Sequence, residues 1–452
     1  MVDRPETLKV TFHRSHFLSI GHQRNSTDSR LPLARPPTLN EPSLNDPPMT
    51  TRRNFLAATA ASFTLPTVFQ RMAAAAPGLD QRGAKDTILV IVQLTGGNDG
   101  LNTVVPSADP IYQKARPTLK IPNETVLKLQ QGLGLAPTMK GFSTLWEASQ
   151  LAIIQGVGYA QPNRSHFESM DIWHKATMSP AEKYGWLGRS APELGGAGDG
   201  VLHIGDGEPP LAVYGATGYA PSMRSMQDFQ LKTGTGAEGD RRRVAVQSLA
   251  EKATGGDDLL SFVQSSAKQS FASAARIREV AAEYKTGVDY PQTPLAQRLK
   301  LIAQLIDAQL PQRVYYVSHD GFDTHAGQAI SHGQLLGTLA TAMQSFHTDL
   351  KEHGHAERVT GFVFSEFGRR VAENGSAGTD HGTAAPVFLT GASVKGGLHG
   401  AHPSLENLDD GDVKFHTDFR SVYATLLQDV LGVDPGKVLT GQYPTLPVIR
   451  RG

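Results

Sequence analysis

The chain of 452 residues contains no cysteine. This absence excludes a disulfide framework, a thiolate zinc site and a cysteine nucleophile, so any metal must be held mainly by His, Asp and Glu. A net charge is absent as well, because 43 Lys and Arg balance 43 Asp and Glu. We therefore expect no nucleic-acid partner. Sixteen His are present, which is ample for metal binding and acid–base chemistry.

Residues 1–48 lack any sustained apolar period and are rich in Pro, Asn, Ser and Arg. This composition predicts either a disordered segment or an upstream extension that is not translated. In the second case Met49 is the true start of the protein. Mass spectrometry tests this hypothesis directly, because a peptide from residues before Met49 would contradict it.

Residues 49–76 have the features of a twin-arginine signal peptide. Arg52 and Arg53 precede a mildly apolar stretch, and small residues at 74–76 offer a cleavage site. The stretch is short and interrupted by Pro66, so we expect no stable membrane anchor. These features predict recognition by the twin-arginine export machinery and a periplasmic or secreted mature protein.

Five short apolar runs are bounded by Gly and polar residues. They are Ile88–Leu94, Leu151–Val157, Val314–Val317, Phe362–Phe364 and Pro386–Leu389. Such runs are typical of strands in a sheet that is covered on both faces. Helical patterns lie between them, at Met139–Ala148, Asp257–Tyr284, Pro294–Leu310 and Gln334–Glu352, and a closing one follows at Asp418–Leu431.

This alternation predicts an α/β fold with a doubly wound, mainly parallel sheet flanked by helices. We expect a single domain over residues 86–432. A Gly-rich, irregular stretch at about 185–256 is interpreted as an insertion that shapes a substrate cleft.

Groups that suit a metal or acid–base site stand at the ends of the predicted strands. They are Asp99 after the first strand; Arg164, Ser165 and His166 after the second; Asp320, Asp323 and His325 after the third; Glu366 and Arg369 after the fourth; and Asp380 and His381 before the fifth. In a parallel sheet all carboxyl ends lie at one edge, so we expect these groups to converge there.

Each group also has a structural interpretation. Asp99 stands in an Asp-Gly turn, where Asp is common for conformational reasons. Ser165 and Glu168 form a capping-box pattern that predicts a helix from there towards Lys175. Capping does not exclude function, because a helix N-terminus favours anions and could activate a hydroxyl nucleophile.

Several stretches together resemble one known family. They are GGNDGLNTVVP, NRSHF, GWLGR, GFDTHAGQ, FSEFGRRVAENGSAGTDHGTAAPVFLTG, GGLHG and TDFRSVYATLLQDVLG. On these the chain is identified as a member of an exported bacterial family, domain of unknown function 1501, which resembles the alkaline phosphatase and sulfatase superfamily. The resemblance covers residues 86–432 and implies an alkaline-phosphatase-like fold, with metal ions at the carboxyl edge of the sheet and a hydroxyl nucleophile.

The resemblance also implies roles for single residues. Asp99 takes the place of the carboxylate after the first strand, and Ser165 takes the place of the nucleophile. Asp323 and His325 resemble a metal-binding pair, although their spacing is shorter than usual and leaves Asp320 as a rival.

The stretch from Glu366 to His381 allows two alignments with the superfamily. In the first, Asp380 and His381 are the Asp-His pair. In the second, which keeps the strand on each side, Glu366 and His381 are ligands and Asp380 only orients His381. The second alignment puts Phe367 where a ligating His would stand, which implies that a second metal site is weakened or missing.

These considerations predict an exported, metal-dependent hydrolase of small-molecule or glycan phosphate or sulfate esters. A divalent metal, Zn²⁺ or Mn²⁺, suits mixed imidazole and carboxylate ligands. Arg164, His166 or Arg369 would hold the anion. The alternative is a non-catalytic exported binding or assembly protein with a degenerate site. A Ser-His-Asp acyl hydrolase lacks the nucleophile-elbow sequence, and the modified nucleophile of sulfatases lacks its Cys/Ser-x-Pro-x-Arg setting.

Overall fold

The computed structural model describes residues 87–194, 200–226 except 217, and 282–450, together with isolated positions between 237 and 279. The predicted extension at 1–48, the predicted signal peptide at 49–76 and most of the predicted helix at 257–284 lie outside the described residues. Within the described ranges, no helix has both the length and the apolar character needed to cross a membrane.

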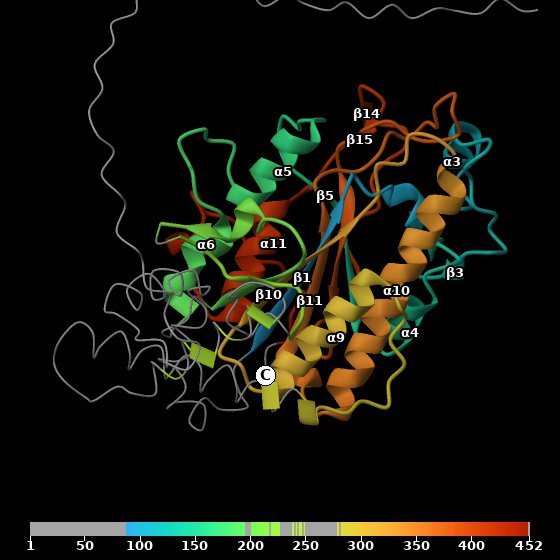
Figure 1. Ribbon diagram of the computed structural model, residues 1–452. Helices are drawn as coiled ribbons and strands as arrows, with labels where there is room; N and C mark the ends of the chain where they lie inside the picture. Colours follow the sequence, from blue (N-terminus) through green and yellow to red (C-terminus); the bar gives the residue numbers. More distant parts are fainter. Residues whose placement is uncertain are drawn as a thin grey trace, which may run out of the picture. The chain divides into compact units, whose positions relative to one another are not determined.

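A nine-stranded sheet forms the centre of the fold (Figure 1). Its order is β13 (Gly397–His399), β5 (Leu151–Gly158), β12 (Ala385–Thr390), β11 (Val359–Ser365), β1 (Ile88–Thr95), β10 (Val314–Asp320), β6 (Val201–Ile204) and β9 (Ser222–Met223), with β16 (Thr417–Asp418) also paired to β5. All five apolar runs predicted as strands belong to this sheet.

The sheet is mainly parallel, as predicted. Central β1 pairs in parallel with β10, where Leu89 lies opposite Val314, and with β11, where Leu89 lies opposite Thr360. Only β12 runs against its neighbours, β11 and β5. Its start, rather than its end, therefore lies at the same edge as the carboxyl ends of the other strands.

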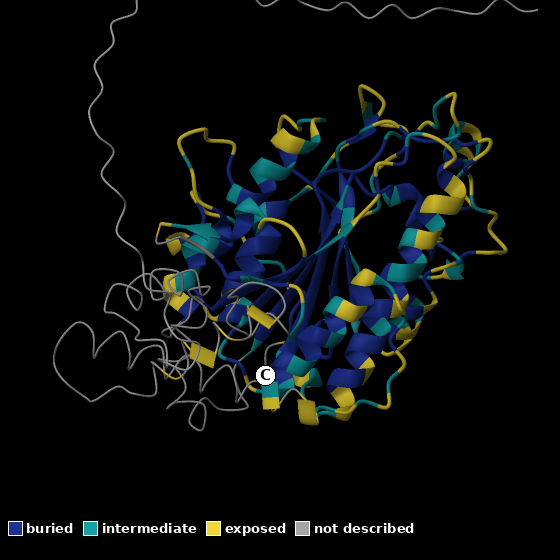
Figure 2. Ribbon diagram, viewed as in Figure 1, coloured by how far each residue is buried: buried dark blue, intermediate teal, exposed yellow. Residues whose placement is uncertain are grey.

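Helices cover both faces of the sheet, which confirms the doubly wound α/β prediction (Figure 1). Alternate residues of β1 point to opposite faces: Val90 and Val92 belong to one core, and Leu89 and Ile91 to the other. The strands are buried accordingly (Figure 2). The first core is closed by α4 (Lys140–Glu147), α9 (Pro294–Asp307) and α10 (Gln328–Glu352), and the second by α5 (His166–Lys175), α6 (Trp186–Ser190), α11 (Phe419–Thr425) and the π-helical η7 (Leu426–Leu431).

Short elements complete the described chain. They are η2 (Gly100–Asn102), β2 (Val104–Val105), α3 (Pro110–Ala115), β3 (Leu127–Lys128), β4 (Gly134–Leu135), η3 (Ala191–Leu194), η4 (Leu211–Val213), β7 (Tyr214–Gly215), β8 (Gly218–Tyr219), η6 (Ala356–Arg358), β14 (Leu408–Asp409), β15 (Asp412–Val413) and η8 (Pro435–Lys437). Antiparallel pairing of β14 with β15 makes a hairpin.

Two local predictions need correction. The long helix α10 begins at Gln328, earlier than the predicted Gln334. Ser165 does occupy the N-cap position of α5, but its side chain makes no capping hydrogen bond. The backbone N–H of Ser165, which Glu168 would receive in a capping box, donates instead to Asn163 Oδ1 at 2.8 Å. The predicted capping box is therefore wrong.

Candidate metal centre

Four segments bring polar side chains to one edge of the sheet. The loop after β10 carries Asp323, the residue after β11 is Glu366, the start of α5 is His166, and the segment before the reversed strand β12 carries His381. The reversal of β12 is what allows a residue that precedes it to meet residues that follow the parallel strands.

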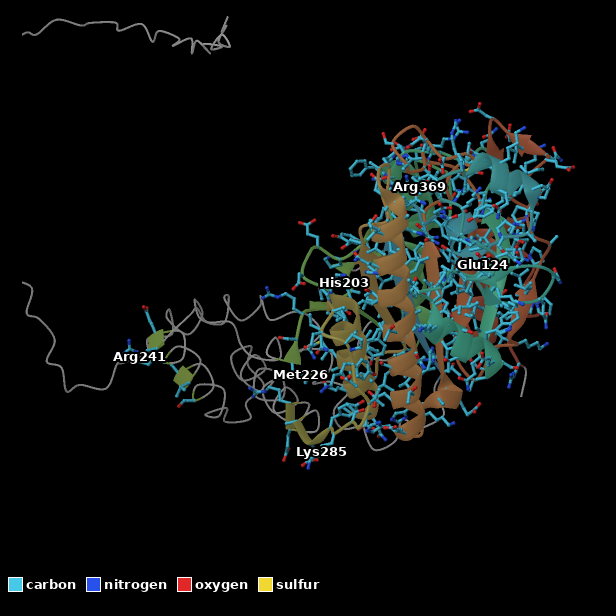
Figure 3. All side chains as sticks on the ribbon, turned by 90° about the vertical axis from the view of Figure 1, so that its right-hand side faces the viewer. Glu124, His203, Met226, Arg241, Lys285 and Arg369 are labelled. Atoms are coloured by element: carbon cyan, nitrogen blue, oxygen red, sulfur yellow. The ribbon has the colours of Figure 1, made fainter. Side chains whose placement is uncertain are left out.

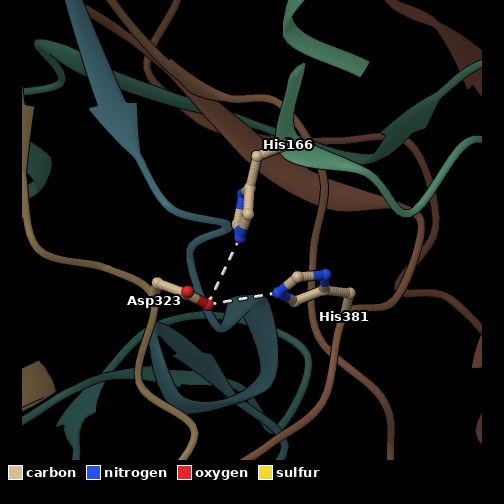
Figure 4. Close-up of side chains that lie close together, drawn as sticks. All are labelled: His166, Asp323 and His381. Carbon is tan, nitrogen blue, oxygen red and sulfur yellow. Dashed lines mark hydrogen bonds and ion pairs between the residues drawn. The ribbon is translucent and has the colours of Figure 1, made fainter. Parts of the chain in front are cut away.

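The imidazoles of His166 and His381 converge on one carboxylate oxygen of Asp323 (Figure 4). His166 Nε2 lies 3.3 Å from Asp323 Oδ1, and His381 Nε2 lies 3.1 Å from the same oxygen. Ligand atoms of the three residues all lie within 4.8 Å of one another. A tetrahedral ion with bonds of about 2.0 Å separates its ligand atoms by roughly 3.3 Å. The spacing therefore fits a small divalent cation.

Both imidazoles have their Nδ1 atoms engaged on the side away from Asp323. His166 Nδ1 lies 2.8 Å from Glu366 Oε1, an acceptor only. His381 Nδ1 lies 2.7 Å from the Arg164 carbonyl oxygen, also an acceptor only. A neutral ring that donates its Nδ1–H to these acceptors presents the lone pair of Nε2 to Asp323, whereas without a cation Nε2 can carry a proton and donate to Asp323 Oδ1. Histidines oriented by such partners are characteristic of metal ligands.

The Nε2 atom of His166 supports this interpretation independently. It is buried, and within the described part of the chain it has no hydrogen-bond partner. Two imidazole lone pairs facing an ionised carboxylate repel unless a cation or a proton lies between them. The donor set thus fits a divalent metal.

His325 is the nearest additional candidate. Its Nδ1 lies 2.9 Å from Asp323 Oδ1, and its ring centroid lies 4.7 Å from that of His381. It does not belong to the group whose ligand atoms all lie within 4.8 Å. The Asp323–His325 pair expected from the family resemblance is thus close in space, but His166 and His381 complete the closer set.

Glu366 is buried behind His166 and is held by three donors. Its Oε1 accepts from Gly96 N at 2.9 Å as well as from His166, and its Oε2 accepts from Ser365 Oγ at 2.8 Å. Sequence reasoning placed Glu366 among the metal ligands, whereas the structure places it one step back, as the acceptor that orients His166.

Arg369 is almost fully buried and binds Asp323 from the interior of the protein. It donates to Asp323 Oδ1 at 2.7 Å, to the carbonyl oxygens of Gly97 at 2.8 Å and Thr379 at 2.7 Å, and also to those of Gly96 and Phe322. In Figure 3, Arg369 is labelled near the top of the view and Lys285 at the bottom. Because its donors are used inside the protein, Arg369 is a positioning residue and not the predicted anion clamp.

The surroundings shift the pKa values of all three converging residues. Burial opposes ionisation of Asp323, but hydrogen bonds from Arg369 and His381 outweigh it and lower its pKa to about 2. The hydrogen bond to Glu366 raises the pKa of His166 against the effect of burial. Burial lowers the pKa of His381, despite its hydrogen bond to the Arg164 carbonyl. The carboxylate is thus ionised and one imidazole is kept neutral.

Phe367 forms an apolar wall beside the histidines. Its ring centroid lies 4.9 Å from those of both His166 and His381. The turn below it requires glycine: Gly97 has φ +76°, and a Cβ there would meet the Phe367 ring at 2.4 Å. Phe367 thus lies against the converging histidines, and its place at the position of a ligating His stays a prediction of the family resemblance.

Asp99 lies in a separate, fully buried network. Its Oδ2 accepts from Arg116 Nη1 at 2.6 Å and from Gln328 Nε2, and its Oδ1 caps η2 by accepting from Leu101 N and Asn102 N. Burial disfavours its charge, but the positive charge of Arg116 prevails and lowers its pKa. The structure therefore does not bring Asp99 to the converging set.

The other predicted residues lie around the centre. Asp320 is exposed at the end of β10, and Asp380 is exposed and accepts from Asn374 Nδ2 at 3.0 Å. The orienting role expected of Asp380 belongs to the Arg164 carbonyl. Ser165 is exposed next to His166, at the start of α5. The guanidinium of Arg164 is engaged by Asp410 and Asp412 of the β14–β15 hairpin.

Sequence reasoning missed the partners that give these groups their roles. Arg116, Asp410 and Asp412 carry no motif that would have singled them out. His166 was predicted as an anion-binding group, and the only signal for a ligand role was its position after a strand at the shared edge.

Comparisons with known proteins complete the description. No curated protein matches the chain. Among solved structures, a sulfatase from Pseudoalteromonas sp. is 12% identical, with 85% of this chain and 72% of that chain covered and a TM-score of 0.36. A protein in the alkaline phosphatase superfamily from Vibrio parahaemolyticus is 10% identical over 86% and 78% of the two chains, with a TM-score of 0.35. A phosphonate monoester hydrolase from Silicibacter pomeroyi is 11% identical over 79% and 76%, with a TM-score of 0.33.

These identities and TM-scores are low, so the similarities imply nothing about the function of the chain. The family comparison is more specific. The model of the family described as protein of unknown function (DUF1501) matches residues 84–443, which is most of the chain. The chain therefore belongs to the DUF1501 family.

Proposed function

We propose that this chain is a metal-dependent hydrolase of phosphate or sulfate esters, with the metal held by His166, Asp323 and His381. One observation carries the proposal: the Nε2 atoms of the two histidines face the same ionised carboxylate oxygen, while both Nδ1 atoms are held by acceptors. Zn²⁺ or Mn²⁺ suits two imidazoles and a carboxylate better than Mg²⁺ does.

When bound, a divalent cation supplies Lewis-acid stabilisation of the anion and lowers the pKa of a nearby hydroxyl. The protein's own residues keep the donors in place. Glu366 and the Arg164 carbonyl fix the tautomers of the two histidines, and Arg369 keeps Asp323 ionised and fixed in position. Phe367 excludes water from one side of the imidazoles.

Ser165 is the nucleophile in this proposal. It precedes His166 at the start of the ten-residue helix α5, and its hydroxyl is not used for capping. The positive end of the helix dipole favours negative charge on that oxygen. Ser165 Oγ would attack phosphorus or sulfur, the alcohol would leave, and water would then release phosphate or sulfate.

A non-catalytic binding protein is the second candidate. Its support is Phe367, which stands where a two-metal site would place a ligand. In the described part of the chain, one group of three metal-binding side chains converges, and it consists of His166, Asp323 and His381. A single weakly polarising site could bind an anion without turning it over.

Metal analysis of the purified protein, combined with assays on aryl phosphate and aryl sulfate esters, separates these functions. We expect about one metal per chain, loss of metal and activity in Asp323→Ala, and loss of activity alone in Ser165→Ala. Metal binding without turnover in the wild type would favour the binding protein. If the wild-type protein takes up no metal after reconstitution, the metal centre is refuted for the hydrolase and for the binding protein alike.

Export by the twin-arginine pathway is part of the same proposal. Its support is the Arg52-Arg53 pattern in the sequence. Replacing both arginines by lysine should leave the full-length protein in the cytoplasmic fraction of a bacterial host, whereas the unaltered protein should appear in the periplasm or medium. Equal export of the two forms would contradict the assignment.

A further inference from the structure

The hairpin of β14 and β15 ends in a two-residue turn, Asp410-Gly411. Asp409 pairs with Asp412 across the hairpin, and the turn residues have φ values of +50° and +85°. Asp-Gly is a preferred sequence for such a type I′ turn, because both central residues must adopt positive φ. The conformation of Asp410 is thus explained by the turn, but the position of its carboxylate is not.

The carboxylate of Asp410 is met by two guanidinium groups. Its Oδ2 lies 3.0 Å from Arg164 Nη1 and 3.3 Å from Arg370 Nη2. The Asp410 side chain is 73% exposed, and each arginine side chain is 35% exposed. Two arginines that share one oxygen of a solvent-accessible anion have the geometry with which proteins bind sulfate and phosphate groups.

Asp412 holds Arg164 from the other side. It is fully buried and accepts from Arg164 Nε at 2.9 Å and from Nη2 at 2.5 Å. Arg164 therefore keeps its place independently of Asp410. The two aspartates differ in this respect: Asp412 fixes the guanidinium, and Asp410 only occupies its remaining donor.

These arginines are joined to the candidate metal centre through the backbone. The Arg164 carbonyl accepts from His381 Nδ1 at 2.7 Å, and Ser165 and His166 follow Arg164 directly. Arg370 follows Arg369, whose side chain holds Asp323. The arginine pair therefore flanks the centre on the side of the hairpin.

We propose that Arg164 and Arg370 form an anion subsite, that Asp410 occupies it in the absence of ligand, and that the subsite takes a second sulfate or phosphate group of the ester. The proposal rests on the proposed function for the identity of the substrate, but not for the existence of the subsite. A tetrahedral anion displaces the Asp410 carboxylate outwards, where it is already solvated, while Asp412 keeps Arg164 ready. The subsite selects esters with more than one anionic group.

Asp410→Asn is the decisive variant, because Asn retains the type I′ turn and removes the charge. Asp409→Asn is its matched control: it is the adjacent exposed aspartate of the same hairpin, and it changes the net charge equally. Binding of inorganic phosphate to the metal-free protein would be measured by isothermal titration calorimetry. We expect the Kd of Asp410→Asn for phosphate to lie about threefold to fivefold below that of the wild type, because this factor corresponds to the free energy of one exposed ion pair. The Kd of Asp409→Asn should equal that of the wild type.

Arg370→Met in the Asp410→Asn background should abolish this gain. The subsite would be overturned if Asp410→Asn bound phosphate no more tightly than Asp409→Asn does. It would also be overturned if neither variant bound phosphate. Metal uptake measured on the same preparations keeps the two proposals apart. Phosphate binding of the expected pattern without metal uptake would refute only the proposed function, and metal uptake without that pattern would refute only the subsite.

Discussion

Replacing Glu366 by Gln tests whether the carboxylate behind His166 prepares a metal ligand. Glu366 Oε1 accepts from His166 Nδ1 at 2.8 Å and from Gly96 N at 2.9 Å, and a Gln carbonyl oxygen can accept both bonds. Oε2 accepts from Ser365 Oγ at 2.8 Å. Ser365 Oγ also lies 2.8 Å from Leu94 O, so in the variant its single hydrogen can donate there while its oxygen accepts from the new amide. The substitution thus removes charge and leaves the hydrogen-bond geometry in place.

The expected effect is on metal affinity. A charge-assisted hydrogen bond is roughly twice as strong as a neutral one, and changes to partners of metal-ligating histidines cost about 10- to 100-fold in affinity. We expect the Kd for Zn²⁺ of Glu366→Gln, measured by competition with a chromogenic chelator, to rise by about that factor. Thermal unfolding of the metal-free proteins should differ little, because no buried donor loses its partner.

Glu168→Gln is the matched control for this experiment. It removes the same charge two residues from His166, but from an exposed side chain. Its Zn²⁺ affinity should remain within about twofold of the wild-type value, as expected for an exposed charge. If Glu366→Gln binds Zn²⁺ as tightly as Glu168→Gln does, Glu366 does not prepare His166, and the metal-centre interpretation loses its strongest support.

Three further predictions concern buried charges. Asp99→Asn should lower the free energy of unfolding by about 3–5 kcal/mol, because it leaves the buried charge of Arg116 without the carboxylate that neutralises it. Metal stoichiometry should stay unchanged, and loss of metal from a folded variant would show that Asp99 is a ligand. Arg369→Lys keeps a positive charge near Asp323, but the lysine ammonium cannot reach all five acceptors of the guanidinium. Chelator competition should therefore show a Zn²⁺ affinity reduced by about 10-fold or more, and an unchanged affinity would contradict the positioning role. Burial lowers the pKa of five histidines to about 4, below the ordinary 6.5, so the unfolded chain binds more protons between these values. Stability is fully present above pH 6.5, falls as the pH approaches 4, and decreases by up to about 3 kcal/mol per histidine, which urea unfolding at several pH values would detect. The five are His174, His203, His332, His347 and His402.

The sheet could be predicted because its signal is local. A run such as Ile88–Leu94 has no polar alternation, so both of its faces must be buried, and short runs of this kind separated by helical patterns define a doubly wound fold. The prediction that polar groups gather at one edge follows from parallel strands. The antiparallel direction of β12 could not be read in the same way, because a short apolar run such as Pro386–Leu389 has the same pattern in either direction.

Roles within the site depend on contacts that sequence spacing does not encode. His166 and Glu366 are separated by 200 residues, and His381 and the Arg164 carbonyl by 217. Nothing local distinguishes a carboxylate that binds a metal from one that orients a histidine. Asp99 illustrates the same limit: an Asp in a Gly-rich turn after a strand suits a ligand, but Arg116 neutralises it in the folded chain.

The charges around the centre explain how it could attract an anion without a free arginine next to it. The negative charge of Asp323 is balanced by Arg369, whose donors are all directed inwards. Glu366 adds one negative charge, and it is buried behind His166. With both histidines neutral, a divalent cation held by His166, Asp323 and His381 would give this group one net positive charge. In the proposed hydrolase that excess would hold the ester group to be cleaved, while Arg164 and Arg370 would hold a second anionic group at the hairpin in place of Asp410.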